Sequence, residues 1–82
     1  MRLFTLPSLP SGISARKAQR ALERLGFYFV RQKGSHIILK RPHPTDPEDV
    51  IVLPNHKEID KWTLGDSLKL GNVGIDEFLD SL

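Results

Sequence analysis

The sequence predicts an α+β fold in which helices pack on one face of a three-stranded antiparallel sheet. Three observations lead to this prediction. An amphipathic helical segment comes first, three short runs rich in β-branched and aromatic residues follow, and two helical segments with apolar faces end the chain. The expected order is α-β-β-β-α with a short extra C-terminal helix. Packing all helices on one face is economical and leaves the other face in water.

The first helix is expected to span residues 15–25. Ser14 before it is a favoured N-cap residue, and Gly26 after it is the residue type that most often ends a helix. Between them, apolar residues recur at positions 18, 22 and 25, the spacing of one helix face. Residues 1–12 contain two prolines and a glycine, so we expect them to be extended or irregular, and they do not fit a signal peptide.

Three strands are expected next, over residues 27–32, 35–41 and 50–53. Lys33 and Gly34 supply a tight turn, so the first two strands form a hairpin. Prolines at positions 42, 44 and 47 prevent regular pairing, so residues 42–48 are expected to be a loop.

Two helices are expected in the last third of the chain, after an irregular polar stretch at 55–62. Thr63 resembles an N-cap with Asp66 in the first turn, and Gly71 ends that helix. Its core-facing residues are expected to be Leu64, Leu68 and Leu70. The apolar side of the last helix is expected to comprise Ile75, Phe78, Leu79 and Leu82.

Charge is distributed unevenly along the 82 residues, although the net charge is only +2. Residues 1–41 hold nine Lys or Arg against one acid, whereas residues 42–82 hold three Lys against nine acids. A basic half on a small domain indicates a polyanionic partner, or else solvated faces that cluster by sign. The chain has no cysteine, which excludes disulfides and thiolate metal sites. No apolar run approaches the roughly 18 residues that span a membrane, so we expect a cytoplasmic protein without a membrane partner.

Arg16, Arg20 and Arg24 are spaced four residues apart, so they share one face of the first helix, and Lys17 flanks them. Such a stripe fits a row of nucleic-acid phosphates. The alternative is an ordinary solvated helix face.

His36 follows a turn glycine and a serine at the start of the second strand. Alternation along the strand places it on the face of Ile38 and Lys40, opposite Ile37 and Leu39. Histidine titrates nearest to neutral pH and transfers protons in many active sites. Cleaving RNA requires little more than a base for the 2′-hydroxyl and cations for the developing phosphate charge. The alternative is an ordinary surface or hydrogen-bonded histidine.

The other two histidines have less context. His43 lies between prolines in the loop and is interpreted as incidental. His56 follows the third strand, where it either approaches His36 or caps backbone groups. The three histidines lack the spacing of metal ligands, so we expect no metal and no cofactor.

Five strings of residues form a recognisable pattern. They are Leu25-Gly26-Phe27, Val30-Arg31-Gln32-Lys33-Gly34-Ser35-His36, Leu53-Pro54-Asn55-His56, Thr63-Leu64 and Asp76-Glu77-Phe78-Leu79. Together they resemble a known family, the HicA toxins, which are mRNA interferases. The resemblance runs from about Ser14 to Leu79, and the Arg-Gln-Lys-Gly-Ser-His string is its most specific part. Many members carry a second histidine where this chain has Ile37, and the loop from Pro42 to Asp49 is longer and richer in proline than usual.

The resemblance implies a double-stranded-RNA-binding-domain-like fold, with residues 1–82 forming one HicA-like domain. It implies the toxin component of a type II toxin–antitoxin system, a metal-independent endoribonuclease in which His36 is the catalytic residue, with mRNA and a HicB-like antitoxin as partners. His56 is a candidate auxiliary residue. The candidate RNA-binding residues are Arg16, Lys17, Arg20, Arg24, Arg31, Lys33, Ser35 and Lys40.

Two other functions fit the same fold, because a fold does not determine a function. One is a non-catalytic RNA-binding module. The other is an interaction domain whose basic face serves only an acidic protein partner. The Gly34-Ser35-His36 string favours the ribonuclease over both.

Overall fold

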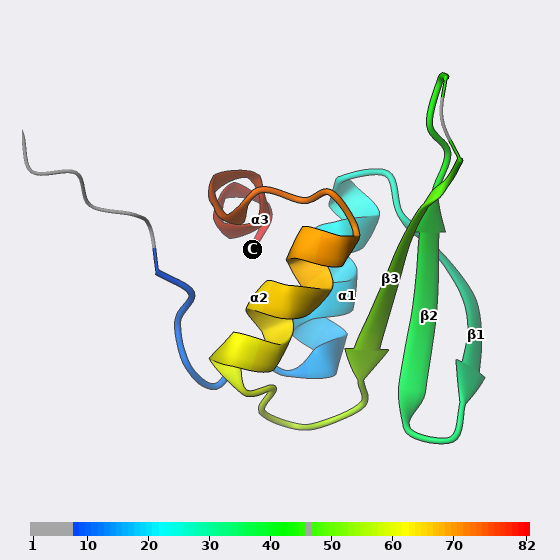
Figure 1. Ribbon diagram of the computed structural model, residues 1–82. Helices are drawn as coiled ribbons and strands as arrows, with labels where there is room; N and C mark the ends of the chain where they lie inside the picture. The colour runs from blue at the N-terminus through cyan, green and yellow to red at the C-terminus, as the bar shows by residue number, and fades with distance from the viewer. Residues whose placement is uncertain (1–7, 46) are drawn as a thin grey trace, which may run out of the picture.

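The computed structural model describes residues 8–45 and 47–82. Its sheet has the order β1-β2-β3 with antiparallel neighbours, and the helices lie on one side of it (Figure 1). The predicted α+β fold is therefore confirmed. In chain order the elements are α1 (Ala15–Arg24), β1 (Tyr28–Lys33), β2 (His36–Arg41), β3 (Asp49–Pro54), α2 (Lys61–Leu70) and α3 (Ile75–Ser81).

The first helix begins and ends as the sequence predicts, to within a residue. The Ser14 hydroxyl oxygen accepts the backbone N–H of Lys17 at 3.0 Å, which satisfies one of the free donors of the first turn. Gly26 has a φ of +97°, a conformation that a residue with a side chain rarely adopts, and it turns the chain into β1. The buried face of α1 consists mostly of alanines, which let the helix lie close to its neighbours.

The hydrophobic core lies between the helices and the inner face of the sheet. In β2 the side chains of Ile37 and Leu39 are buried, and Leu53 and Ile51 of β3 lie directly opposite them. The predicted alternation in β2 is therefore confirmed. The helices pack mainly against β3, and β1 lies farthest from them (Figure 1), which is why Phe29 on the inner face is still 48% exposed.

The second helix corrects two predictions. It begins at Lys61, not after Thr63, because Asp60 is the N-cap and its carboxylate accepts the backbone N–H groups of Trp62 and Thr63 at 3.1 Å each. Thr63 is thus inside the helix. Leu70 does not face the core, since it is 80% exposed at the last position of α2. The buried side chains on this helix are Leu64, Ser67 and Leu68.

Irregular segments occupy most of the places where they are expected. Residues 8–12 contain no helix or strand, while residues 1–7 of the predicted irregular segment and Asp46 of the loop lie outside the described residues. The loop ends at Glu48, because Asp49 already belongs to β3. None of the helices in the described part of the chain is long and apolar enough to cross a membrane.

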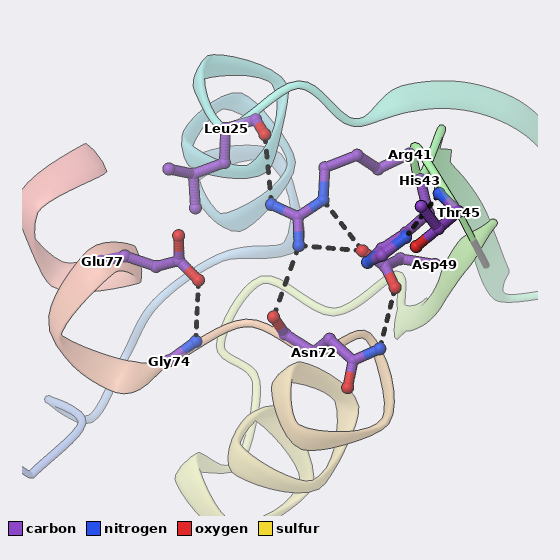
Figure 2. A network of polar contacts seen from close by, with 8 residues as sticks. All are labelled: Leu25, Arg41, His43, Thr45, Asp49, Asn72, Gly74 and Glu77. Carbon is purple, nitrogen blue, oxygen red and sulfur yellow. Dashed lines mark hydrogen bonds and ion pairs between the residues drawn. The ribbon is translucent and has the colours of Figure 1, made fainter. Parts of the chain in front are cut away.

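Arg41 and Asp49 connect β2 and β3 to the helices (Figure 2). They lie at the end of the sheet that carries the loop between these two strands, here called the loop end. Asp49 is only 4% exposed, and its carboxylate accepts hydrogen bonds from the Arg41 guanidinium at 2.9 and 3.0 Å and from the Asn72 side chain at 2.8 Å. Arg41 also donates to the backbone oxygens of Leu25 and Asn72 at 3.3 Å and lies 4.5 Å from the ring centre of Phe27. These contacts connect β2 and β3 to the ends of α1 and α2.

Candidate functional site

The face of the sheet that the helices leave uncovered is here called the open face. Residues directly opposite each other on antiparallel strands share a face, so the register assigns three rows to it. The rows are Tyr28–Lys40–Val50, Arg31–Ile38–Val52 and Lys33–His36–Pro54. The open face therefore combines an apolar centre with basic side chains and one histidine.

His36 occupies the last row, at the end of the sheet here called the hairpin end. This end contains the β1–β2 turn, the end of β3 and the start of α1 (Figure 1). His36 is exposed, and Lys33 lies opposite it in the register. Two hydrogen bonds stabilise the turn before His36, in which Gly34 has a φ of +60°. The Gly34 carbonyl accepts the Gln32 side-chain amide at 2.9 Å, and the Ser35 carbonyl accepts the Asn55 backbone N–H at 2.6 Å.

A β-bulge determines which β1 side chains accompany His36. Phe29 pairs with Leu39 and Arg31 with Ile38, so Val30 is the extra residue between them. From Arg31 to the end of β1, the bulge fixes which residues share the face of His36. Arg31 and Lys33 both fall on the open face, within two rows of the histidine.

Lys40 is on the open face, as predicted from strand alternation, but it lies at the opposite end of β2 from His36. Lys40 is four positions after His36, or about 13 Å along the strand. Lys40 is 3.9 Å from the Glu48 carboxylate, which also accepts a hydrogen bond from the Tyr28 hydroxyl at 2.6 Å. The bond to Glu48 raises the pKa of the Tyr28 hydroxyl above its ordinary value. Glu48 thus offsets the positive charge at the loop end of the open face.

The basic side chains on α1 extend from one end of the molecule to the other. Arg16, Lys17 and Arg20 are exposed, and Arg16 lies in the first turn at the hairpin end. Arg24 is in the last turn, about 12 Å further along the helix axis. Its guanidinium donates to the backbone oxygen of Ser81 at 2.8 Å, so it connects α1 to the end of α3. The structure therefore groups Arg16, and not Arg24, with the end that carries His36.

His56 also lies at the hairpin end, where its backbone carbonyl accepts the N–H of Ala15 at 2.9 Å. It lines a cavity of about 280 Å³ together with Arg16, Ser14, Asn55 and Lys57. Sequence reasoning did not single out Asn55 or Lys57. Their polar run directly after Pro54 was the available signal, but the packing of that run against α1 depends on long-range contacts such as the Ile13–Ile59 bridge.

A larger cavity of about 470 Å³ lies on the outer side of α2, and its lining includes Trp62, which is 74% exposed, but no residue of the open face. Within residues 8–45 and 47–82, no group of three His, Asp or Glu side chains is arranged to hold a metal ion. The His43 ring nitrogen accepts the backbone N–H of Thr45 at 3.4 Å in the loop (Figure 2).

Comparison with known proteins identifies the family. A family model described as the HicA toxin of bacterial toxin–antitoxin systems matches residues 15–71, from the first residue of α1 to the end of α2. The match covers more than half of the chain and includes both β2 with His36 and the polar run after β3. No curated protein and no solved structure gives a significant match. On the strength of the family match, this chain belongs to the HicA toxin family of bacterial toxin–antitoxin systems.

Proposed function

We propose that this chain is a metal-independent endoribonuclease toxin that cleaves mRNA, with His36 as its catalytic residue. One observation carries the proposal: His36 is exposed at the end of an open, basic sheet face, with Lys33 opposite it. Membership of a toxin family supports the same function. The position leaves the histidine accessible to an RNA strand.

The chemistry requires one proton acceptor and a positive environment. The imidazole of His36 takes the proton of a ribose 2′-hydroxyl, and the 2′-oxygen attacks the adjacent phosphorus. The bond from phosphorus to the 5′-oxygen then breaks, and this oxygen receives a proton from the imidazolium or from water. The products are a 2′,3′-cyclic phosphate and a free 5′-hydroxyl. Lys33 and Arg31, both on the open face, stabilise the extra negative charge on the phosphorus centre.

RNA binding in this proposal uses basic groups on two surfaces. Arg31 and Lys33 lie on the open face, and the exposed Arg16, Lys17 and Arg20 on α1. Because both sets include members at the hairpin end, an RNA strand can contact them while it passes His36. Ser35 at the turn and Lys40 at the far end of β2 extend this surface.

The antitoxin partner of the family is proposed to be a HicB-like protein that covers the open face and blocks His36. The apolar side chains of this face support the proposal, since Tyr28, Val50 and Val52 are between 40% and 45% exposed and no helix or strand of the described residues covers them. The surrounding cations Arg31 and Lys33 fit an acidic partner, and such complementarity mainly speeds association and selects the partner. A complex in which His36 stays open and RNA cleavage stays intact would contradict masking.

The deciding experiment measures cleavage of a long RNA by the purified native chain and by His36→Ala, each with and without EDTA. We expect the native chain to cleave in both conditions and the variant to lose at least about 100-fold in rate. His43→Gln is the matched control, because it removes a histidine from the loop end of the molecule and keeps a hydrogen-bond acceptor.

Circular dichroism checks that the variants fold. Native-rate cleavage by His36→Ala, or loss of native cleavage in EDTA, would refute the mechanism. RNA binding without any cleavage by the native chain would favour the non-catalytic RNA-binding module instead.

A further inference from the structure

We propose that the cavity at the hairpin end binds a phosphate group of the RNA strand and thereby positions that strand relative to His36. The identity of the ligand as RNA rests on the proposed function. The cavity itself is defined independently, by residues from the start of α1 and from the segment after β3. Its lining residues are Ser14, Arg16, Asn55, His56 and Lys57.

The size of the cavity suits a phosphate group. Its volume is about 280 Å³. A phosphate group fits into such a volume, and because the cavity is open to solvent, the rest of an RNA strand can extend out of it.

The charge of the lining suits an anion. Arg16 and Lys57 are cationic, His56 is the third basic residue, and none of the described residues contributes an acidic side chain to the wall. Basic groups gathered in this way repel one another until an anion neutralises them. Arginine and lysine are also the side chains that most often bind phosphate oxygens. The lining therefore recognises negative charge through its own basic side chains and not through a bound metal ion.

Neutral donors add to the basic groups. The Ser14 hydroxyl accepts the Lys17 N–H through its oxygen, so its hydrogen is available to donate. The Asn55 side-chain amide supplies further donors. The first turn of α1 contributes one more: the Ala15 and Lys17 N–H groups have partners, but in the described part of the chain the Arg16 N–H has none. The lining thus offers several hydrogen-bond donors to a phosphate group.

The cavity is close enough to His36 to contact the same RNA strand. Pro54 lies opposite His36 in the register, and the cavity residues 55–57 follow it directly. Paired Cα atoms are about 5 Å apart and consecutive ones 3.8 Å, so the Cα atoms of His36 and His56 are at most about 13 Å apart. A short stretch of single-stranded RNA spans this distance. A phosphate held in the cavity would fix which neighbouring phosphate meets His36.

The test measures binding of a short single-stranded RNA oligonucleotide to the cleavage-deficient His36→Ala chain, with and without Arg16→Gln plus Lys57→Gln. Both replaced residues are exposed, and neither side chain has a hydrogen bond or ion pair within the described residues, so folding is preserved. We expect the affinity to fall at least about tenfold at low salt. The slope of log K against log[salt] should decrease by about 0.7, the contribution of one phosphate on a single strand.

The matched control is Lys61→Gln plus Lys69→Gln in the same background, which removes two charges from the wall of the larger cavity on α2. It should keep the salt slope. In addition, titration with inorganic phosphate followed by NMR should shift the amide signals of Arg16, Asn55 and His56. Equal slopes for both double variants would overturn the proposal. So would phosphate-induced shifts without any RNA affinity, or a loss of antitoxin binding with unchanged RNA affinity.

The outcomes separate this inference from the proposed ribonuclease function. If the native chain never cleaves RNA but binding still depends on the Arg16 and Lys57 pair, the cavity is supported and the ribonuclease is refuted. If the native chain cleaves and the double variant raises KM while kcat is unchanged, both are supported, because the cavity acts in binding. If the chain cleaves and neither KM nor affinity changes, only the cavity is refuted.

Discussion

The two ends of strand β2 have opposite chemical environments. Arg41, its last residue, is one-fifth exposed at the side chain, is bonded to the buried Asp49 and contacts the aromatic ring of Phe27. His36, its first residue, is exposed, and the turn and the backbone around it fix its place. The two residues are about 17 Å apart along the strand. One short strand thus combines a stabilising contact and a candidate reactive group.

Stability and the proposed chemistry therefore depend on different residues, at opposite ends of this fold. At the loop end, charged groups are buried and paired, so removing one leaves its partner unsatisfied. At the hairpin end, basic groups are exposed and have no ion-pair partner among residues 8–45 and 47–82, so replacing them changes the electrostatic field around His36 with little effect on folding. Each of the following predictions tests this separation.

The first prediction concerns the reactive end. His36→Ala should lower the cleavage rate by about 10²–10⁴-fold, because it removes the proton acceptor. Its free energy of unfolding should stay within about 0.5 kcal/mol of the native value, because the side chain is exposed. Urea unfolding followed by circular dichroism measures the second quantity. A large loss of stability would show that the two ends are coupled after all.

The second prediction concerns the stabilising end. Arg41→Ala should lower the free energy of unfolding by about 3 kcal/mol, the lower end of the range for breaking a buried ion pair, because it leaves the Asp49 carboxylate without its charged partner. Lys40→Ala is the matched control in the neighbouring position. Its ion pair with Glu48 is solvent-exposed, so its loss should cost at most about 1 kcal/mol. Equal losses for the two variants would contradict the interpretation.

The third prediction is a pH dependence that arises at the stabilising end. Hydrogen bonding from Asn72 and then the ion pair with Arg41 lower the pKa of the Asp49 carboxyl below its ordinary value of 3.8, although burial acts against this. Between the two pKa values the unfolded chain binds more protons than the folded one. The contribution of Asp49 to stability is therefore complete above pH 3.8 and is lost as the pH falls through the folded-state pKa.

Thermal unfolding of the native chain and of Asp49→Asn, measured over a series of acidic pH values, checks this prediction. The variant should be less stable near neutral pH, and its stability should depend less on pH in the acidic range. Parallel curves for the two proteins would mean that other carboxyl groups account for the acid sensitivity.

The fourth and smallest effect concerns the α1 stripe, and it compares two arginines within one helix. Arg20 is exposed, whereas the Arg24 guanidinium donates to the Ser81 backbone oxygen at the far end. Arg20→Ala should reduce the salt slope of single-stranded RNA binding by about 0.7, and Arg24→Ala should leave the slope nearly unchanged. Titrations at several salt concentrations measure both slopes. An unaffected slope in Arg20→Ala would remove this face from the RNA-binding surface.

Local patterns in the sequence were sufficient to predict the element order and the placement of His36. The alternation of β2, the caps of α1 and the glycine turns each depend on a few adjacent residues. Asp60 was missed as the N-cap of α2, because Thr63 three residues later offered a similar cap pattern. Leu70 was expected in the core, but it lies two residues after the buried Leu68 and therefore on the opposite side of the helix.

The parts that the sequence did not reveal depend on contacts between distant segments. Asp49 is an acid beside a proline-rich loop, a setting typical of an exposed residue, and only the approach of Asn72 and Arg41 explains its burial. The sequence likewise did not indicate that Asn55 and Lys57 line a cavity, because the opposite wall comes from α1, about 40 residues earlier in the chain. Neither contact has a local periodicity that would have predicted it.

The bulge at Val30 has a consequence for how this surface depends on strand pairing. If residue 30 were deleted, Arg31 would follow Phe29 directly and would lie opposite Ile38, as it does now. If instead the bulge were lost and all residues stayed, Val30 would pair with Ile38, Gln32 would lie opposite His36, and Arg31 would turn toward the helix layer. Losing the bulge alone would thus neutralise the surroundings of the histidine without replacing any charged residue. The polarity of this site depends on the pairing register of β1 as much as on its composition.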